Sequence, residues 1–122
     1  MRIAKSFKDR GVDSKVIALE PASSPILSKG IKGAHNVEGV GLGFIPSIYN
    51  SEYVDDVISI EESLARQTCK ELASKEGIFC GTSSAMNVAG AIKLSKSLGP
   101  KSKVVAVACD TGLKYLSEGL FS

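Results

Sequence analysis

Two continuous apolar runs constrain the fold of this 122-residue chain more than any other feature. They occupy residues 16–19 and 104–108. A strand without alternating polar residues is typical of a parallel sheet, because both faces of such a sheet are covered. Shorter, mostly apolar runs at residues 57–60 and 78–80 are predicted to be two further strands.

Helical patterns lie between these predicted strands. A short helix is predicted over residues 2–8, and a second helix begins near Glu62, with Ser59 and Glu62 as a capping box, and ends at Gly77. A third helix is predicted from about residue 84 to residue 98. The alternation predicts an α/β fold, a partial three-layer parallel sheet with helices on both faces.

The turn that leads from residues 78–80 into the third helix carries two adjacent hydroxyl groups, those of Ser83 and Ser84. Unpaired backbone N–H groups at the start of a helix favour a polar or anionic ligand group. The two serines can equally serve as helix caps and nothing more. In parallel sheets ligands bind at the carboxyl ends of the strands, and this turn follows such an end.

Composition excludes several classes of partner. The net charge of +2 arises from mixed charges without basic blocks, and the chain has no Trp, so neither a nucleic-acid footprint nor a base-stacking platform is expected. No apolar run is long enough to cross a bilayer, so no membrane partner is expected either. The three cysteines are widely spaced and fit neither a disulfide framework nor a metal site, which favours a reducing compartment, the cytoplasm.

The predicted sheet is thin for an independent domain. Residues 104–108 need neighbours on both faces, and four strands leave at least one apolar strand at an edge. The chain therefore fits one half of a larger domain as well as it fits a small domain, and a partner segment is expected.

Four segments occur in an order and spacing that match a known family. They are residues 16–28 (VIALEPASSPILS), 32–46 (KGAHNVEGVGLGFIP), 77–91 (GIFCGTSSAMNVAGA) and 110–121 (DTGLKYLSEGLF). Together they resemble the cysteine synthase and cystathionine β-synthase family, fold-type II pyridoxal-phosphate enzymes. The resemblance implies a tryptophan synthase β-like fold, of which residues 1–122 are the C-terminal part of the large domain.

The resemblance implies pyridoxal phosphate as the cofactor and assigns roles to matching positions. Ser83 corresponds to the serine whose hydroxyl bonds the pyridine nitrogen, and Gly39, Gly41 and Gly43 let the backbone approach the cofactor and substrate. A neutral hydroxyl at this nitrogen suits β-elimination and β-replacement better than transamination. Asp110 either orders the serine turn or is only a turn former at a strand end.

Two positions depart from the family pattern. Ala85 stands where the family usually has glycine, and its methyl group either crowds the site or tightens helix packing. Cys109 replaces a proline and is predicted to be a small buried residue. These departures leave open whether the small amino-acid substrate is O-acetylserine or serine.

The family's Schiff-base lysine, substrate-carboxylate loop and phosphate loop lie upstream of the segments matched here. The resemblance therefore implies no catalytic residue within this chain, which is expected to be inactive in cysteine synthesis from sulfide until its N-terminal half completes it. The expected partner is that missing half or a homo-oligomer. The alternative is a non-catalytic regulatory or interaction remnant that keeps the fold. An unrelated nucleotide-binding domain would need a glycine-rich strand-to-helix turn that the sequence lacks.

Two further residues invite a catalytic interpretation. Lys8, within the sequence SFKDRG, resembles the lysine motif of threonine synthases, but a late strand of the domain follows at once, so Lys8 is predicted to face solvent. His35 is the single histidine and is predicted to form structural hydrogen bonds rather than to act as a base or ligand.

Overall fold

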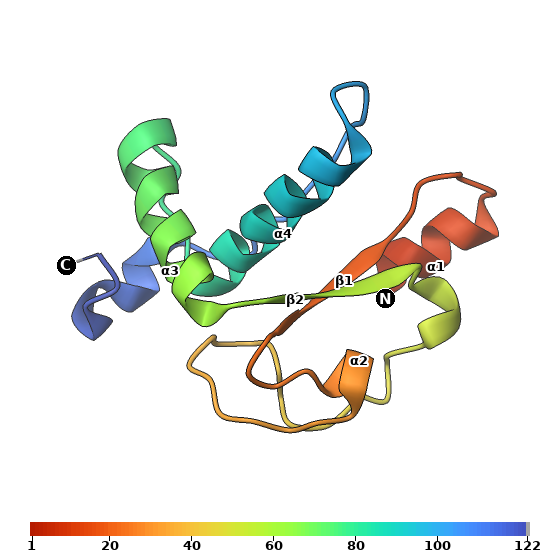
Figure 1. Ribbon diagram of the computed structural model, residues 1–122, viewed down its shortest axis with the longest axis horizontal. Helices are drawn as coiled ribbons and strands as arrows, with labels where there is room; N and C mark the ends of the chain where they lie inside the picture. The colour runs from red at the N-terminus through yellow and green to blue at the C-terminus, as the bar shows by residue number, and fades with distance from the viewer. Residues whose placement is uncertain (122) are drawn as a thin grey trace.

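The computed structural model describes residues 1–121 and shows two parallel strands flanked by helices (Figure 1). β1 (Ile17–Pro21) pairs with β2 (Asp56–Ile60), from Ile17 opposite Asp56 to Pro21 opposite Ile60. Both strands lie where the apolar runs predicted them. The parallel pairing and the surrounding helices confirm the α/β class.

Three longer helices, α1 (Arg2–Asp9), α3 (Glu62–Glu71) and α4 (Thr82–Leu98), contain most of the helical residues. The other helical elements are α2 (Ile26–Lys29), η1 (Ser51–Tyr53), the π-helical extension of α3, η2 (Leu72–Glu76), and η3 (Gly112–Glu118). The predictions of α1, α3 and α4 are confirmed, whereas α2, η1 and η3 were not predicted. In Figure 1, α3 and α4 lie on one side of the strands, and α2 with the long loop that follows it lies on the other.

Residues 78–80 and 104–108 are not strands, which corrects two sequence predictions. The sheet described for residues 1–121 contains only β1 and β2. A strand is stabilised by a ladder of backbone hydrogen bonds, and neither segment pairs into one within this part of the chain. Residues 104–108 are held locally by Asn87, whose amide donates to the Val107 carbonyl at 2.9 Å, and Val105 is 91% exposed.

The core consists of two small clusters that meet along α3 and α4. One contains Val37, Ile60, Ala65, Met86 and Ala89, and the other contains Cys69, Cys80, Ala85, Tyr115 and Leu120. Small side chains on both helices permit close packing, as predicted for α4. Ile92 and Leu98 were predicted to lie on the apolar side of α4, but both residues are exposed and contribute nothing to the core.

The predicted capping box at α3 is wrong. The N-cap residue is Glu61, and no side chain caps the helix. Ser59 lies inside β2, where its hydroxyl donates to Glu20 Oε1 at 3.2 Å. The serine that sequence spacing assigned to a helix therefore serves a buried carboxylate in the sheet.

Glu20 ties the end of β1 to α2. Its side chain is 2% exposed, and its oxygens accept hydrogen bonds from Leu27 N at 2.7 Å, from Ser28 N at 3.3 Å and from the hydroxyls of Ser28 and Ser59. Since Pro25, the N-cap residue of α2, provides no side-chain bond, Glu20 caps this helix from outside. The start of the long loop is thereby fixed to the sheet.

Within residues 1–121, no helix combines the length and apolar character needed to cross a membrane.

Candidate functional site

The N-terminus of α4 is capped by a side chain distant in sequence. Gly81, its N-cap residue, has no side chain to offer. Asp110 takes this role, since its Oδ1 accepts from Gly81 N at 3.0 Å and from Ser84 Oγ at 2.6 Å. The Tyr115 hydroxyl donates to Asp110 Oδ2 at 2.6 Å. Of the two roles considered for Asp110, the structure shows the one that orders the serine turn.

The two adjacent serines of this turn differ sharply. Ser84 is fully buried, donates to Asp110 and accepts from Cys109 N at 2.8 Å and from Asp110 N at 3.3 Å. One donated and two accepted bonds use the full capacity of a hydroxyl. Ser83 is half-buried, and its hydroxyl has no hydrogen-bond partner within residues 1–121. Ser83 is thus the serine that remains available to a ligand.

The electrostatics of the turn centre on Asp110. Burial alone would raise the pKa of its carboxyl, but the hydrogen bonds from Ser84, Tyr115 and Gly81 outweigh burial and hold the pKa below the usual 3.8. The carboxylate is therefore charged at neutral pH, and its position near the first turn of α4 is also favoured by the helix dipole.

Lowering the pH should reduce the free energy of unfolding by protonating Asp110. Because the folded-state pKa of Asp110 lies below its unfolded value, its contribution to stability is present above the unfolded pKa and is lost as pH falls through the folded pKa. We expect the difference in unfolding free energy between the unsubstituted chain and Asp110→Asn to shrink below about pH 4. Urea titrations at pH 7, 4 and 3 measure it; a difference that stays constant across this range would contradict the assignment.

A serine-to-alanine pair tests the difference between the two hydroxyls. Ser84→Ala leaves the part-buried Cys109 N–H and the Asp110 carboxylate without their partner, so we expect a loss of about 2 kcal/mol in unfolding free energy. Ser83→Ala removes no side-chain hydrogen bond seen in the described part of the chain and should change stability by less than about 0.5 kcal/mol. Chemical denaturation of both variants provides the measurement, and equal losses would contradict the unequal roles seen here.

The glycine loop adopts a backbone conformation that side chains disfavour. Gly39, Gly41 and Gly43 have φ values of 80°, 57° and 79°. At Gly41 a Cβ would also lie 2.3 Å from His35 Nε2. No atom lies within 4 Å of a Cβ built at Gly39, so that position faces open space.

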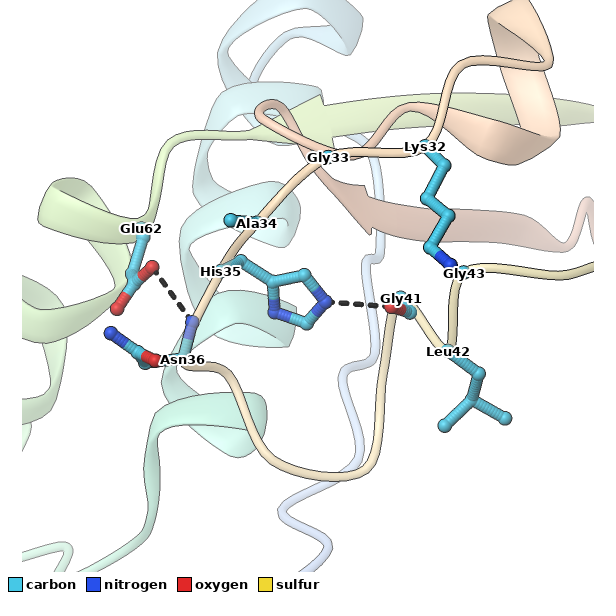
Figure 2. A pocket seen from close by; sticks show the side chains of 9 residues that line it. All are labelled: Lys32, Gly33, Ala34, His35, Asn36, Gly41, Leu42, Gly43 and Glu62. Atoms are coloured by element: carbon cyan, nitrogen blue, oxygen red, sulfur yellow. Dashed lines mark hydrogen bonds between the residues drawn. The ribbon is translucent and has the colours of Figure 1, made fainter.

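His35 holds the two arms of this loop together, as Figure 2 shows. Its Nδ1 accepts from Val37 N at 3.1 Å, so the ring proton lies on Nε2, which donates to the Gly41 carbonyl at 2.7 Å. The predicted hydrogen-bonding role of His35 is confirmed.

A shallow cavity of about 350 Å³ opens between the arms of the loop (Figure 2). It is lined by Lys32, Gly33, Ala34, His35, Asn36, Gly41, Leu42, Gly43 and Glu62. Burial would raise the pKa of the Glu62 carboxyl, but bonds from the Asn36 backbone and Arg66 lower it overall. Gly41 lines this cavity, whereas Gly39 and Ser83 lie outside its lining.

The loop and the serine turn share supporting residues. Val37 of the loop is buried against Met86 and Ala89 of α4. Glu38 Oε1 of the loop lies 3.3 Å from Nζ of Lys114, and Lys114 directly precedes Tyr115 in the chain. Among the described residues, Ser83 forms no hydrogen bond to Gly39 or Gly41. The glycine loop is therefore held against α4 through Val37 and is linked to η3 through Glu38.

The remaining candidate residues lie as follows. Lys8 is exposed at the end of α1, as predicted, and donates to the Glu52 carbonyl. Cys109 is exposed, which corrects the prediction of a buried residue, because the segment before it lacks a covering layer. Burial raises the pKa of Cys69 to about 11, and its thiol donates to the Cys80 carbonyl, so this cysteine is a packing residue. Ala85 is fully buried in the same cluster as Cys69 and Cys80, where its methyl group tightens helix packing.

Comparison with known proteins agrees with these features. Residues 3–110 match the family described as pyridoxal-phosphate dependent enzyme. A probable cysteine synthase of Bacillus subtilis is 42% identical over 118 residues, which are 97% of this chain and 38% of that protein. Cysteine synthase B of Campylobacter jejuni is 38% identical over 98% of this chain and 40% of its own length.

Solved structures show the same likeness. A cysteine synthase from Entamoeba histolytica superposes with a TM-score of 0.89 at 33% identity, over 98% of this chain and 36% of that one. An O-ureido-L-serine synthase reaches a TM-score of 0.89 at 32% identity, over 98% of this chain and 38% of that chain. The present chain spans about two fifths of the length of the curated relatives named above.

The family and the cysteine synthase relatives use pyridoxal phosphate, which confirms the cofactor predicted from the four motifs. By the match over residues 3–110 and its cysteine synthase relatives, this chain belongs to the family of pyridoxal-phosphate dependent enzymes.

Proposed function

We propose that this chain forms the serine-turn side of the cofactor site in a cysteine synthase-type enzyme, which joins O-acetylserine or serine with sulfide to give cysteine. The observation that carries the proposal is the hydroxyl of Ser83, half-buried at the N-terminus of the 17-residue helix α4 and without a hydrogen-bond partner among residues 1–121. Ser83 follows Gly81 and Thr82 in the segment that resembles the family's cofactor-binding turn.

The residues present fit a pyridine ring. Ser83 offers a neutral hydroxyl, and the charge of the nearby Asp110 is already engaged by Gly81, Ser84 and Tyr115. When bound, pyridoxal phosphate supplies an electron sink for the α-carbon of an amino acid. Ser83 would hold the ring nitrogen without placing a carboxylate against it, which favours β-replacement over transamination.

The glycine loop would form a second side of the same site. Gly39 faces open space, and Gly41 is fixed by His35, so the backbone can approach a ligand closely and in a defined place. Gly39 and Gly41 are therefore proposed to contact the cofactor together with Ser83. The substrate would be a small amino acid.

Residues 1–122 are proposed to be the C-terminal part of the complete domain. The share of about two fifths of each relative supports this, as does the position of the family's Schiff-base lysine and phosphate loop upstream of the matched motifs. The chain would act with an N-terminal segment that supplies these groups, or would assemble as a homo-oligomer. The buried free thiols of Cys69 and Cys80 suit the cytoplasm.

A complementation experiment tests the proposal. The chain would be co-expressed with the part of the Bacillus subtilis relative that it does not cover, and cofactor absorption and cysteine formation from O-acetylserine and sulfide would be measured. We expect both to arise only with the two pieces together. Ser83→Ala should alter the cofactor absorption, whereas Ser97→Ala, an exposed serine on the same helix, should not.

A second measurement separates the alternatives. After incubation of the chain alone with pyridoxal phosphate and borohydride, we expect no site-specific lysine adduct. A stoichiometric adduct on Lys8 would contradict the proposal. A folded chain that neither binds the cofactor nor gains activity with the N-terminal piece would favour the non-catalytic remnant instead.

A further inference from the structure

The first turn of α4 carries two neighbouring hydroxyls, and a ligand could bind to either of them. Ser83 and Ser84 both belong to α4, and either could cap the helix or bind a ligand. A site that relies on one of them must keep the other from competing. In this chain, the competing hydroxyl is occupied by residues that come 25 and 26 positions later.

We infer that Asp110 is a positioning residue that commits Ser84 to the protein and thereby leaves Ser83 as the hydroxyl offered to a ligand. The part of this inference that concerns the ligand, which we call the ligand side, rests on the proposed role of Ser83. The part that concerns how Asp110 holds Ser84, which we call the protein side, rests on hydrogen-bond geometry alone.

The link between Asp110 and Ser84 is reciprocal. Ser84 Oγ donates to Asp110 Oδ1 at 2.6 Å, and the Asp110 backbone N–H donates back to Ser84 Oγ at 3.3 Å. Cys109 N donates to the same hydroxyl at 2.8 Å, so the direction of the hydroxyl proton is fixed toward the carboxylate. A hydroxyl with this set of partners has no capacity left for a ligand.

The carboxylate is itself held on both oxygens. Gly81 N donates to Oδ1, and the Tyr115 hydroxyl donates to Oδ2. A Cβ at Gly81 would lie 2.3 Å from Oδ2, so the absence of a side chain there lets the carboxylate approach the turn. Asp110 thus has one position from which it reaches both the helix cap and Ser84, and that position includes no bond to Ser83 among the described residues.

Amide hydrogen exchange on the isolated chain tests the protein side without cofactor. Asp110→Ala should accelerate exchange at the Gly81 and Cys109 amides at least tenfold, while Ala89 in the interior of α4 stays protected. Asp110→Asn should restore most of the protection, because its amide oxygen can still accept from Gly81 and Ser84. Asp13→Ala, an exposed control, and Ser83→Ala should leave both amides unchanged.

The same experiment can overturn the inference. Unchanged exchange at Gly81 and Cys109 in Asp110→Ala would do so, as would a failure of Asp110→Asn to restore protection. Where Asp110→Ala does not fold, Tyr115→Phe replaces it, and exchange at Gly81 should rise several-fold because Oδ2 loses its donor. No rise in that variant would equally overturn the inference.

The ligand side is tested in the complemented enzyme by a double-substitution cycle read from the cofactor's absorption spectrum. Ser83→Ala should shift the spectrum strongly when Asp110 is present and less when Asp110 is alanine, because the freed Ser84 then competes. With asparagine, which still accepts from Ser84, the shift should stay large. Equal shifts with aspartate and with alanine would overturn the selection role. An unsubstituted complemented enzyme that binds no cofactor would instead contradict the proposed function, while the exchange experiment still decides whether Asp110 holds Ser84.

Discussion

Replacing Glu20 by alanine is expected to lower the free energy of unfolding by about 3 kcal/mol, since hydrogen bonds to a charged group contribute about 1.5–3 kcal/mol each and are not additive. The side chain is 2% exposed and accepts from Leu27, Ser28 and Ser59. Alanine would leave the Leu27 N–H and the Ser59 hydroxyl without their acceptor in a part-buried place. Urea unfolding followed by circular dichroism measures the loss.

Two companion variants make the test specific. Glu20→Gln keeps one acceptor oxygen but turns an NH₂ group toward backbone donors, so it should lose roughly half as much stability as alanine. Glu76→Ala, at an exposed position, should stay within about 0.5 kcal/mol of the unsubstituted chain. If Glu20→Ala proved as mild as Glu76→Ala, the carboxylate would not be the anchor of α2 that the structure shows.

The effect should also reach the candidate site. Glu20 caps α2, and the hydroxyl of Ser24, two residues before that helix begins, accepts from Gly33 N at 3.1 Å. Gly33 lies only two residues before His35, which holds the glycine loop. Loss of Glu20 should therefore speed amide exchange at Val37, whose N–H donates to His35.

Local sequence patterns predicted the position of an element correctly where that position depends on the element's own residues. The apolar run before Pro21 and the run that ends at Ile60 gave both strands their correct places, and Gly77 and Gly99 mark helix ends as predicted. The left-handed φ of 67° at Gly77 explains why a glycine stands there.

Predictions failed where an element depends on a partner that local patterns do not identify. Residues 104–108 have a strand-like composition, yet strand structure needs pairing, and no pairing occurs within residues 1–121. The Ser59–Glu62 spacing fits a capping box, but the buried Glu20, 39 residues earlier, takes the Ser59 hydroxyl. The cost of leaving such a carboxylate unpaired outweighs the modest gain from a helix cap.

The candidate site was predicted only in part for the same reason. Ser83 and the glycines were identified by their resemblance to family motifs, and no local rule separated Ser83 from Ser84. The distinction comes from Asp110, 26 residues after Ser84. The available signal was an acidic residue at the end of an apolar run, which placed Asp110 near the turn without showing which serine it binds.

Gly81→Ala should be among the most damaging single substitutions at the turn, with an expected loss of about 3 kcal/mol from overpacking. The backbone at Gly81, with φ −86° and ψ −179°, is open to alanine, so the effect is purely steric. Its Cβ would lie 2.3 Å from both Asp110 Oδ2 and Tyr115 Cε2. These atoms cannot move apart without breaking the bond between Asp110 and Tyr115.

Gly90→Ala provides the matched control on the same helix. The three atoms nearest to a Cβ there all belong to the Leu19 side chain, its two methyl groups at 2.8 Å and its Cγ at 3.4 Å, and this side chain can rotate away. Alanine also gains up to about 1 kcal/mol of helix propensity over glycine, so the net change should stay within about 1 kcal/mol. Thermal and urea unfolding of both variants measure the contrast. Similar losses would mean that crowding along α4 in general limits stability, whereas a loss confined to Gly81→Ala would show that the rigid carboxylate cap of Asp110 requires glycine at the start of this helix.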